Sequence, residues 1–163
     1  MPTKAKHYIP EGYTSLTPYI VVRDAARAIE WYSKALGAKE IMRMPTPDGR
    51  IGHAEMQFGN ARLMLGDEFP EQGARAPQTV GGSPVHIFLY CENVDATFKN
   101  AVANGATSRM PPTDMFWGDR YGKLGDPFGH EWGLATHTTD CTEEEMAKGA
   151  EEWAAASVKK ASA

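Results

Sequence analysis

Hydrophobic and polar positions in the first half of the chain follow first a strand-like and then a helix-like pattern. Residues 17–23 are rich in β-branched and aromatic side chains, which favours a strand. Apolar residues then recur at helical spacing between Asp24, which can cap a helix, and Gly37, which can end one. The pattern after Gly37 predicts three more strands, at residues 39–44, 51–58 and 61–65.

The second half repeats this order. Residues 85–90 are strand-like, and an apolar helical stripe follows between Asn93, a cap, and Gly105, a stop. The next predicted strands are residues 107–110, 120–124 and 130–136. The predicted caps Asp24 and Asn93 are separated by almost the same length of chain as the predicted stops Gly37 and Gly105. Two supersecondary units at one period indicate a duplicated βαβββ module.

These patterns divide the 163 residues into five segments. We expect an N-terminal arm (1–16), a first module (17–67), a linker loop (68–84), a second module (85–137) and a C-terminal helix (138–163). Thr142 and Glu145 fit a capping box for that helix. Its predicted apolar face, which would dock on the body or on a second subunit, comprises Met146, Ala150, Trp153, Ala154 and Val158. The predicted fold class is α+β: duplicated βαβββ modules form a curved mixed sheet around a cavity, with a C-terminal helix added.

Each strand can be split into two faces, because successive side chains point to opposite sides of a sheet. One face is aliphatic and should be covered by the helix of its module. The other face mixes acids, histidines, an arginine and aromatic rings. Its polar groups would need hydrogen-bond partners if they were buried away from water. Such a face suits a wet concave cavity for a small, partly aromatic ligand, although it could also simply meet solvent. Its members include Tyr19, His53, Glu55, Arg62, Met64, His86, Phe88, Tyr90 and Glu131.

Composition narrows the range of partners. The net charge of −4 and the lack of a Lys/Arg-rich run argue against nucleic acid. No apolar stretch is long enough for a membrane helix, and the N-terminus has no signal-peptide pattern, so we expect no membrane partner. Cys91 and Cys141 form no disulfide framework, which fits a cytoplasmic location.

Four segments in this order resemble the vicinal oxygen chelate superfamily, which holds glyoxalase I, bleomycin-resistance proteins and extradiol dioxygenases. They are residues 22–37, 61–68, 94–106 and 126–137, and residues 10–19 and 116–122 are similar to the PhnB-like branch. The resemblance spans about residues 8–147. It implies two half-barrels facing each other around a ligand site, and a homodimer.

In metal-using members of that superfamily, ligands come from the first and fourth strands of each module. The resemblance places them at Thr17, Met64, His86 and Gly133, of which only His86 binds a divalent metal well. No cofactor is therefore expected. A divalent metal remains possible if His53, Glu55, His86 and Glu131 converge. Alternatively, Glu55 or Glu131 could act as a base oriented by His53 or Arg62, or His53 and Glu55 could pair with each other, with Arg62 or with Arg43.

Two functions follow. The first is a metal-independent protein that binds a small, partly aromatic molecule, much as the drug-sequestering relatives do. The second is a metal-dependent lyase or dioxygenase, with Glu55 or Glu131 as catalytic candidates and His86, His53 and Glu131 as metal ligands. Phe116, Trp117 and Tyr121 could form a lid or wall over the cavity or merely plug a sheet edge. The expected ligand-binding set is Tyr19, His53, Glu55, Arg62, Met64, His86, Phe88, Tyr90, Phe116, Trp117 and Tyr121.

Overall fold

The chain packs as two compact units. The computed structural model describes residues 2–161, and their side chains as far as residue 156. One unit runs to Val85 and also includes Asp126–His130, and the other comprises His86–Gly125 and the chain from Glu131 onward. Each unit is built around one four-stranded mixed sheet.

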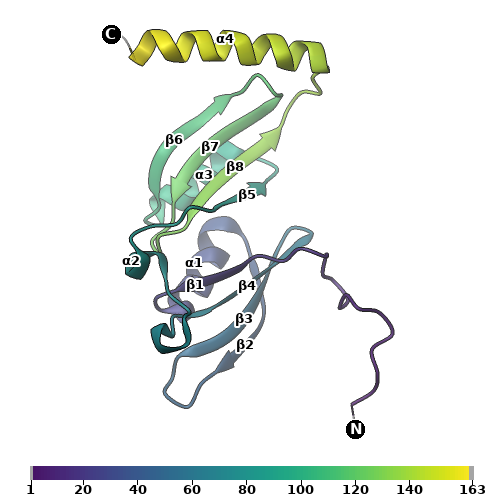
Figure 1. Cartoon of the computed structure of the whole chain (residues 1–163), viewed down its shortest axis with the longest axis vertical. Coiled ribbons are helices and arrows are strands. Elements are labelled where there is room, and N and C mark those ends of the chain that lie inside the picture. Colours follow the sequence, from purple (N-terminus) through teal and green to yellow (C-terminus); the bar gives the residue numbers. More distant parts are fainter. Residues whose placement is uncertain (1, 162–163) are drawn as a thin grey trace. The chain divides into compact units, whose positions relative to one another are not determined.

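The first sheet is made from one βαβββ run (Figure 1). In sheet order its strands are β1, β4, β3 and β2, with β1 parallel to β4 and the other neighbours antiparallel. The elements are β1 (Tyr19–Val22), α1 (Ala25–Leu36), β2 (Lys39–Pro45), β3 (Ile51–Phe58) and β4 (Ala61–Asp67).

The second sheet has the same topology, with the order β5, β8, β7 and β6 and a parallel β5–β8 pair. The duplicated βαβββ modules and the α+β class are thereby confirmed. The elements are β5 (His86–Tyr90), α3 (Val94–Ala103), β6 (Thr107–Asp114), β7 (Asp119–Gly125) and β8 (Glu131–His137).

Most strand ends differ from the sequence prediction by one or two residues, and the larger differences lie in β6 and in the linker. Strand β6 continues beyond residue 110 to Asp114 through Pro111 and Pro112, with a register shift between Met110 and Thr113. An edge strand tolerates proline because one side of its backbone needs no sheet partner, and β6 is an edge strand. The predicted linker loop also holds two short turns, a 3₁₀ turn at Pro70–Gln72 and α2 (Pro77–Val80).

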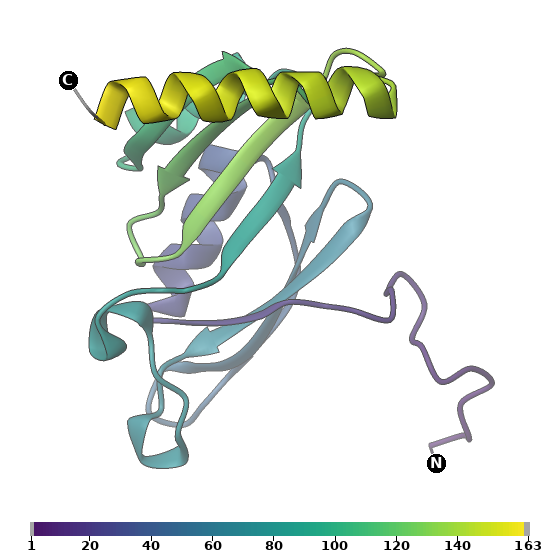
Figure 2. The ribbon, with the colours of Figure 1, turned by 45° about the horizontal axis from the view of Figure 1, so that its top comes forward.

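The predicted helix starts are confirmed by their hydrogen bonds. The Asp24 side chain accepts from the Arg27 backbone N–H, and Asn93 accepts from Ala96. The last helix, α4 (Glu143–Ala161), begins with the expected capping box, in which Thr142 and Glu145 bond to each other's backbone N–H groups. Figure 2 shows α4 lying across one end of the strands of the second sheet.

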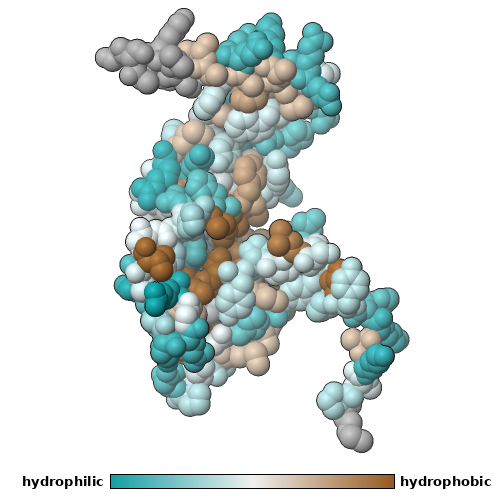
Figure 3. Space-filling view, in the orientation of Figure 1, coloured by the Kyte–Doolittle hydropathy of each residue, from teal (hydrophilic) through white to brown (hydrophobic). Residues whose placement is uncertain are grey.

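Helix α4 makes limited contact with its sheet. Met146 and Gly149 are half-buried, and a Cβ at Gly149 would lie 2.5 Å from Cβ of Phe116. Trp153 is 57% exposed, and the surface of α4 in Figure 3 mixes hydrophilic and weakly hydrophobic side chains. Val158 lies outside the described side chains. Within residues 2–161, every helix is too short or too polar to cross a bilayer.

The aliphatic strand faces form the core of each unit, as alternation predicts. In the first unit these side chains pack with α1, whose Tyr32 is fully buried. In the second, buried Trp132, Leu134 and Leu124 share the core with Phe98 of α3. The buried strand positions of the first unit are Ile20, Val22, Ala54, Met56, Phe58, Leu63 and Leu65.

The β7–β8 turn belongs to the first unit by its packing. Its Gly129 N–H donates to the Asp126 carbonyl over 3.2 Å, as expected for a type I turn. The buried Tyr32 hydroxyl donates to the Asp126 carboxylate over 2.6 Å. The Nε2 atom of His130 lies 2.9 Å from the Val21 carbonyl. The chain between β7 and β8 is thus fixed to α1 and β1.

Candidate functional site

The polar face of the first sheet gathers five of the predicted residues. Strand register aligns Tyr19 with Met64, and Met64 in turn with Glu55. His53 and Arg62 lie on the same face by alternation. This face is opposite the one that packs against α1, so these side chains stay outside the aliphatic core.

His53 and Glu55 pair with each other on this face, which was one of the predicted alternatives. Nε2 of His53 lies 3.3 Å from Oε1 of Glu55, and the His53 ring centroid lies 5.6 Å from that of Tyr19. The Tyr13 hydroxyl, followed by the His53 ring and the Arg62 charge, holds the pKa of the Glu55 carboxyl below its ordinary value, against the opposing effect of burial. Glu55 is therefore a carboxylate at neutral pH, with its charge already shared.

Tyr13 and Arg62 complete this face from the arm and from β4. The Arg62 Cζ atom lies 5.4 Å from the centroid of the Tyr13 ring. Burial, with a smaller contribution from Glu55, raises the pKa of Tyr13 above its ordinary value. Tyr13 was not among the predicted site residues, because nothing in the pattern of the arm indicated that it returns to the sheet.

The polar face of the second sheet carries a row of rings. The Phe88 and Tyr121 rings are stacked, with centroids 5.3 Å apart and planes 5° from parallel. Tyr90 lies 5.0 Å from Phe88, and Trp117 lies 5.9 Å from Tyr121. We call Phe88, Tyr90, Trp117 and Tyr121 the ring row. It retains accessible surface, since Phe88 is 47% and Tyr90 60% exposed.

Phe116 and Trp117 lie in different surroundings. Their rings meet edge to face at 5.0 Å, but Phe116 packs against Gly149 of α4. Trp117 instead continues the ring row, and its indole N–H donates to Asp119 over 3.0 Å. The segment therefore serves both to hold α4 and to extend the aromatic face.

His86 and Glu131 are direct neighbours across β5 and β8. The Glu131 carboxylate is already engaged, because Nη2 of Arg109 lies 3.1 Å from its Oε1 atom. His86 itself is exposed. The second module thus offers one histidine beside an acid that already has a cationic partner.

A buried acid beneath the ring row was missed by the sequence analysis. Asp119 is 3% exposed and accepts hydrogen bonds from Tyr90 and Trp117, each over 3.0 Å. Its other oxygen lies 2.7 Å from Nδ1 of His137, and the Nε2 atom of that ring lies 3.0 Å from Asp140. Asp140 and then Asp119 raise the pKa of His137. Extending the alternation of β7 and β8 by one position would have placed Asp119 and His137 on this face.

The positions that hold a metal in related proteins do not fit one here. A Cβ at Gly133 would lie 2.7 Å from the Tyr121 ring and 3.1 Å from Phe88, so stacked rings occupy the space of a side-chain ligand. Thr17 and Met64 offer no strong donor for Ni²⁺ or Zn²⁺. Across residues 2–161, histidines, cysteines and acids do not gather in threes suited to a metal ion.

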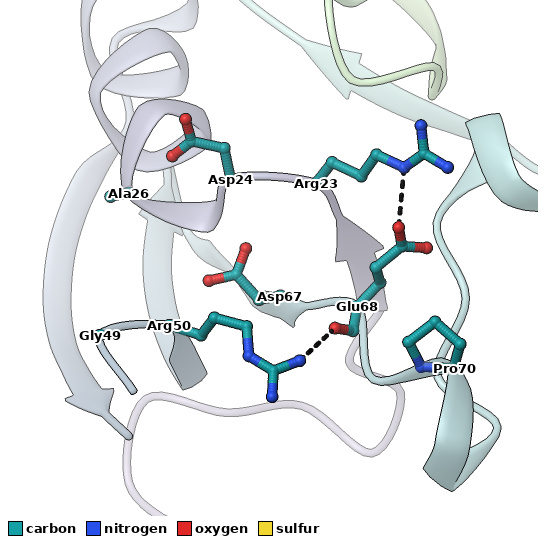
Figure 4. A pocket seen from close by; sticks show the side chains of 8 residues that line it. All are labelled: Arg23, Asp24, Ala26, Gly49, Arg50, Asp67, Glu68 and Pro70. Carbon is teal, nitrogen blue, oxygen red and sulfur yellow. Dashed lines mark hydrogen bonds and ion pairs between the residues drawn. The ribbon is translucent and has the colours of Figure 1, made fainter. Parts of the chain in front are cut away.

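A charged pocket of about 480 Å³ opens elsewhere on the first unit (Figure 4). Arg23 donates to Glu68 over 2.7 Å, and Arg50 donates to the Glu68 carbonyl over 3.2 Å. The Asp67 carboxylate accepts from the backbone N–H groups of Ala25 and Ile51. Arg23 and Glu68 thus form an ion pair inside the pocket, while Arg50 and Asp67 bond to backbone groups there. These contacts fasten the start of the linker to the first module.

Comparison with known proteins identifies the family. A model of the glyoxalase/bleomycin resistance protein/dioxygenase superfamily matches residues 10–134. The chain belongs to this superfamily. It is 42% identical over 135 residues to the uncharacterized protein Mb0911c of Mycobacterium bovis, covering 81% of this chain and 89% of that one. It is 26% identical over 138 residues to YjdN of Escherichia coli, covering 72% of this chain and 91% of YjdN.

Two solved structures share the fold of this chain. TioX from Micromonospora sp. ML1 matches with a TM-score of 0.60 at 24% identity, covering 76% of this chain and 98% of TioX. The PhnB protein of Bacillus cereus matches with a TM-score of 0.59 at 17% identity, covering 76% of this chain and 99% of that one. The expected superfamily and its PhnB-like neighbours are therefore confirmed, and helix α4 lies beyond the matched region.

Proposed function

We propose that this superfamily member binds a small, partly aromatic molecule against the ring row, without a metal. One observation carries the proposal: Phe88 and Tyr121 are stacked on the polar face of the second sheet while Phe88 and Tyr90 remain about half exposed. A flat ring that covers Phe88 and Tyr90 would remove apolar surface from water and gain aromatic contacts. Asp119 orients Tyr90 and Trp117 through their polar atoms, so the row is preorganised.

The donor chemistry supports binding over metal catalysis. Glu55 and Glu131 each have a partner, His53 and Arg109 respectively. Tyr121 and Phe88 fill the space of a ligand at position 133. A metal-dependent lyase or dioxygenase would need about three protein ligands around an open position, and a ligand from position 133 would first require Tyr121 to move.

Titration with 2-naphthol and its saturated counterpart 2-decalol tests the proposal. We expect 2-naphthol to bind with unchanged affinity in the presence of a chelator, and 2-decalol to bind much more weakly, because only the flat ring can stack. Phe88→Ala should weaken 2-naphthol binding about tenfold. Tyr8→Ala is the matched control, since Tyr8 is 92% exposed in the arm. Equal binding of both alcohols, or binding that requires Ni²⁺ or Zn²⁺, would overturn the proposal.

We also propose a homodimer in a reducing compartment. The dimer is what the resemblance to the superfamily implies. Both Cys91 and Cys141 are unpaired thiols, which suits the cytoplasm. Sedimentation velocity of the full chain at micromolar concentration tests the oligomeric state, and a single monomer species there would refute it.

A further inference from the structure

Arg62 lacks the hydrogen-bond acceptors that other arginines of the first unit have. Its Nε and Nη1 atoms are buried, and neither has a hydrogen-bond partner within the described part of the chain. By contrast, Arg23, Arg43 and Arg50 each place a nitrogen 2.5–2.7 Å from a carboxylate oxygen. Buried N–H groups on a charged side chain are costly unless an acceptor meets them.

The N-terminal arm covers this guanidinium. Residues 10–13 form a turn in which the Tyr13 N–H donates to the Pro10 carbonyl over 3.2 Å. Gly12 in this turn packs so closely that a Cβ there would lie 2.9 Å from Nη2 of Arg62. The Tyr13 ring adds a cation–π contact. The turn therefore shields the charge from water while supplying none of the acceptors that a guanidinium binds.

The nearest acid does not fill this role. The Glu55 charge acts on Arg62 at a distance, but no Glu55 oxygen bonds to its N–H groups. Glu55 instead lies 3.3 Å from His53, and the Tyr13 hydroxyl lowers its pKa without an ordinary hydrogen-bond geometry between them. The two donors of Arg62 are thus left for a group from outside the described residues.

We propose that Arg62 anchors the anionic group of a small organic acid, and that the turn at residues 10–13 is the flap that closes over it. A carboxylate or phosphate oxygen is the strongest acceptor for a guanidinium N–H, and the bond is stronger when it is shielded from water. The inference rests on the N-terminal arm and the first module, and not on the ring row. It stands or falls separately from binding at the ring row.

The first test uses the unaltered protein. The side-chain Nε–H signal of Arg62 is followed by ¹H–¹⁵N NMR during titration with benzoate, inorganic phosphate and neutral benzamide. We expect benzoate or phosphate to move this signal downfield, because an anionic acceptor forms a charge-assisted hydrogen bond. Benzamide should leave it in place. No response to either anion, or an equal response to benzamide, would overturn the proposal.

The second test removes the guanidinium, and the expected change in Tm is an increase. Arg62→Met should raise Tm in the absence of anion, because it replaces an unpartnered buried charge with an apolar side chain, and it should abolish the stabilisation by benzoate. Arg43→Met is the control: it removes a guanidinium paired with Glu40, so it should not raise Tm and should keep the benzoate effect. Glu55→Gln should tighten benzoate binding severalfold by removing a repelling charge. Undiminished stabilisation of Arg62→Met by benzoate would refute the anchor.

Discussion

Gly133 shows how one missing Cβ can set the chemistry of a face. Glycine here needs no special backbone conformation, since its φ lies outside the positive range. What matters is the space above it, which the Tyr121 and Phe88 rings fill. A residue with a side chain at position 133 and the stacked rings cannot occupy the same space. This position therefore determines whether the face carries a metal ligand or an aromatic surface.

Gly133→Ala should therefore destabilise the fold by about 1–3 kcal/mol, the usual cost of overpacking. Urea denaturation measures the loss. Gly125→Ala is the control, because a Cβ there meets only the flexible ends of Arg109 and Glu131, each at 3.3 Å. Equal stability of the two variants would show that Tyr121 moves aside easily and that the space is not committed to rings.

His137 is a second position at which one residue determines a measurable property. Asp140 and Asp119 hold it from both ring nitrogens and raise its pKa above 6.5. Protonated His137 therefore stabilises the fold at pH below the unfolded pKa, and this contribution is lost as the pH rises through the folded pKa. Tm should fall across that window in the wild type and less in His137→Gln. His7→Gln, in the exposed arm, is the control and should show the same fall in Tm as the wild type. An NMR pKa of His137 at or below 6.5 would contradict this prediction.

Alternation along the strands predicted most of these residue positions. Period two fixes which side chains share a face, so Tyr19, Glu55 and Met64 could be grouped from the order of residues alone. The interaction partners of these side chains were harder to predict. The pairing of Glu131 with Arg109 depends on strand register across an irregular edge, and the return of Tyr13 to the sheet depends on the path of a loop. Neither leaves a periodic signal.

At the scale of the elements, helix α1 makes a buried hydrogen bond to a distant part of the chain. Its Tyr32 is buried and donates to Asp126 of the β7–β8 turn over 2.6 Å. Burial, together with the Asp126 charge and hydrogen bond, raises the pKa of Tyr32 well above 10. The helix itself was predictable from its caps and apolar spacing. The contact was not, because the two residues are 94 positions apart in the sequence.

Tyr32→Phe should cost about 1–3 kcal/mol, because it removes a buried hydroxyl that donates to the Asp126 carboxylate. Denaturant unfolding gives the value, and the m-value should be unchanged if the transition stays two-state. The matched control is Tyr8→Phe, at a tyrosine that is 92% exposed, which should be neutral. A loss below a few tenths of a kcal/mol in Tyr32→Phe would mean that another donor replaces the hydroxyl.

The same scale shows where periodicity misleads. Pro111 and Pro112 end the predicted strand, yet β6 continues through them because it lies at the sheet edge. Proline also explains the missed turns in the linker, since Pro70 and Pro77 each start a short helical turn. Edge position and turn geometry depend on the tertiary structure. From the sequence alone, these prolines therefore predict only the end of an element.

At the scale of the whole molecule, the duplicated fold was predictable because both modules show the same order of strand patterns, helix pattern and helix-ending glycine. The role of the linker was not. Residues 68–84 could have been a flexible tether, but Glu68 fixes them to the first module: it accepts from Arg23 over 2.7 Å, from the Ala76 N–H over 3.1 Å and from Thr79 over 2.5 Å. Thr79, the Ala76 amide and Arg23 together lower the pKa of Glu68 to about 2.

This anchor should control how readily the linker opens. Glu68→Gln removes the charge, so trypsin should cleave after the exposed Arg75 several times faster than in the wild type, as measured by mass spectrometry of native protein. Low pH should likewise weaken this anchor, because the stabilisation by ionised Glu68 is present above its unfolded pKa near 4.5 and is lost as the pH falls toward 2. Glu71→Gln is the control, since Glu71 is exposed and lies 4.0 Å from its nearest cation, Arg50. If both variants were cut at the wild-type rate, the linker would be held by its backbone turns and apolar contacts, and the Glu68 cluster would be incidental to its order.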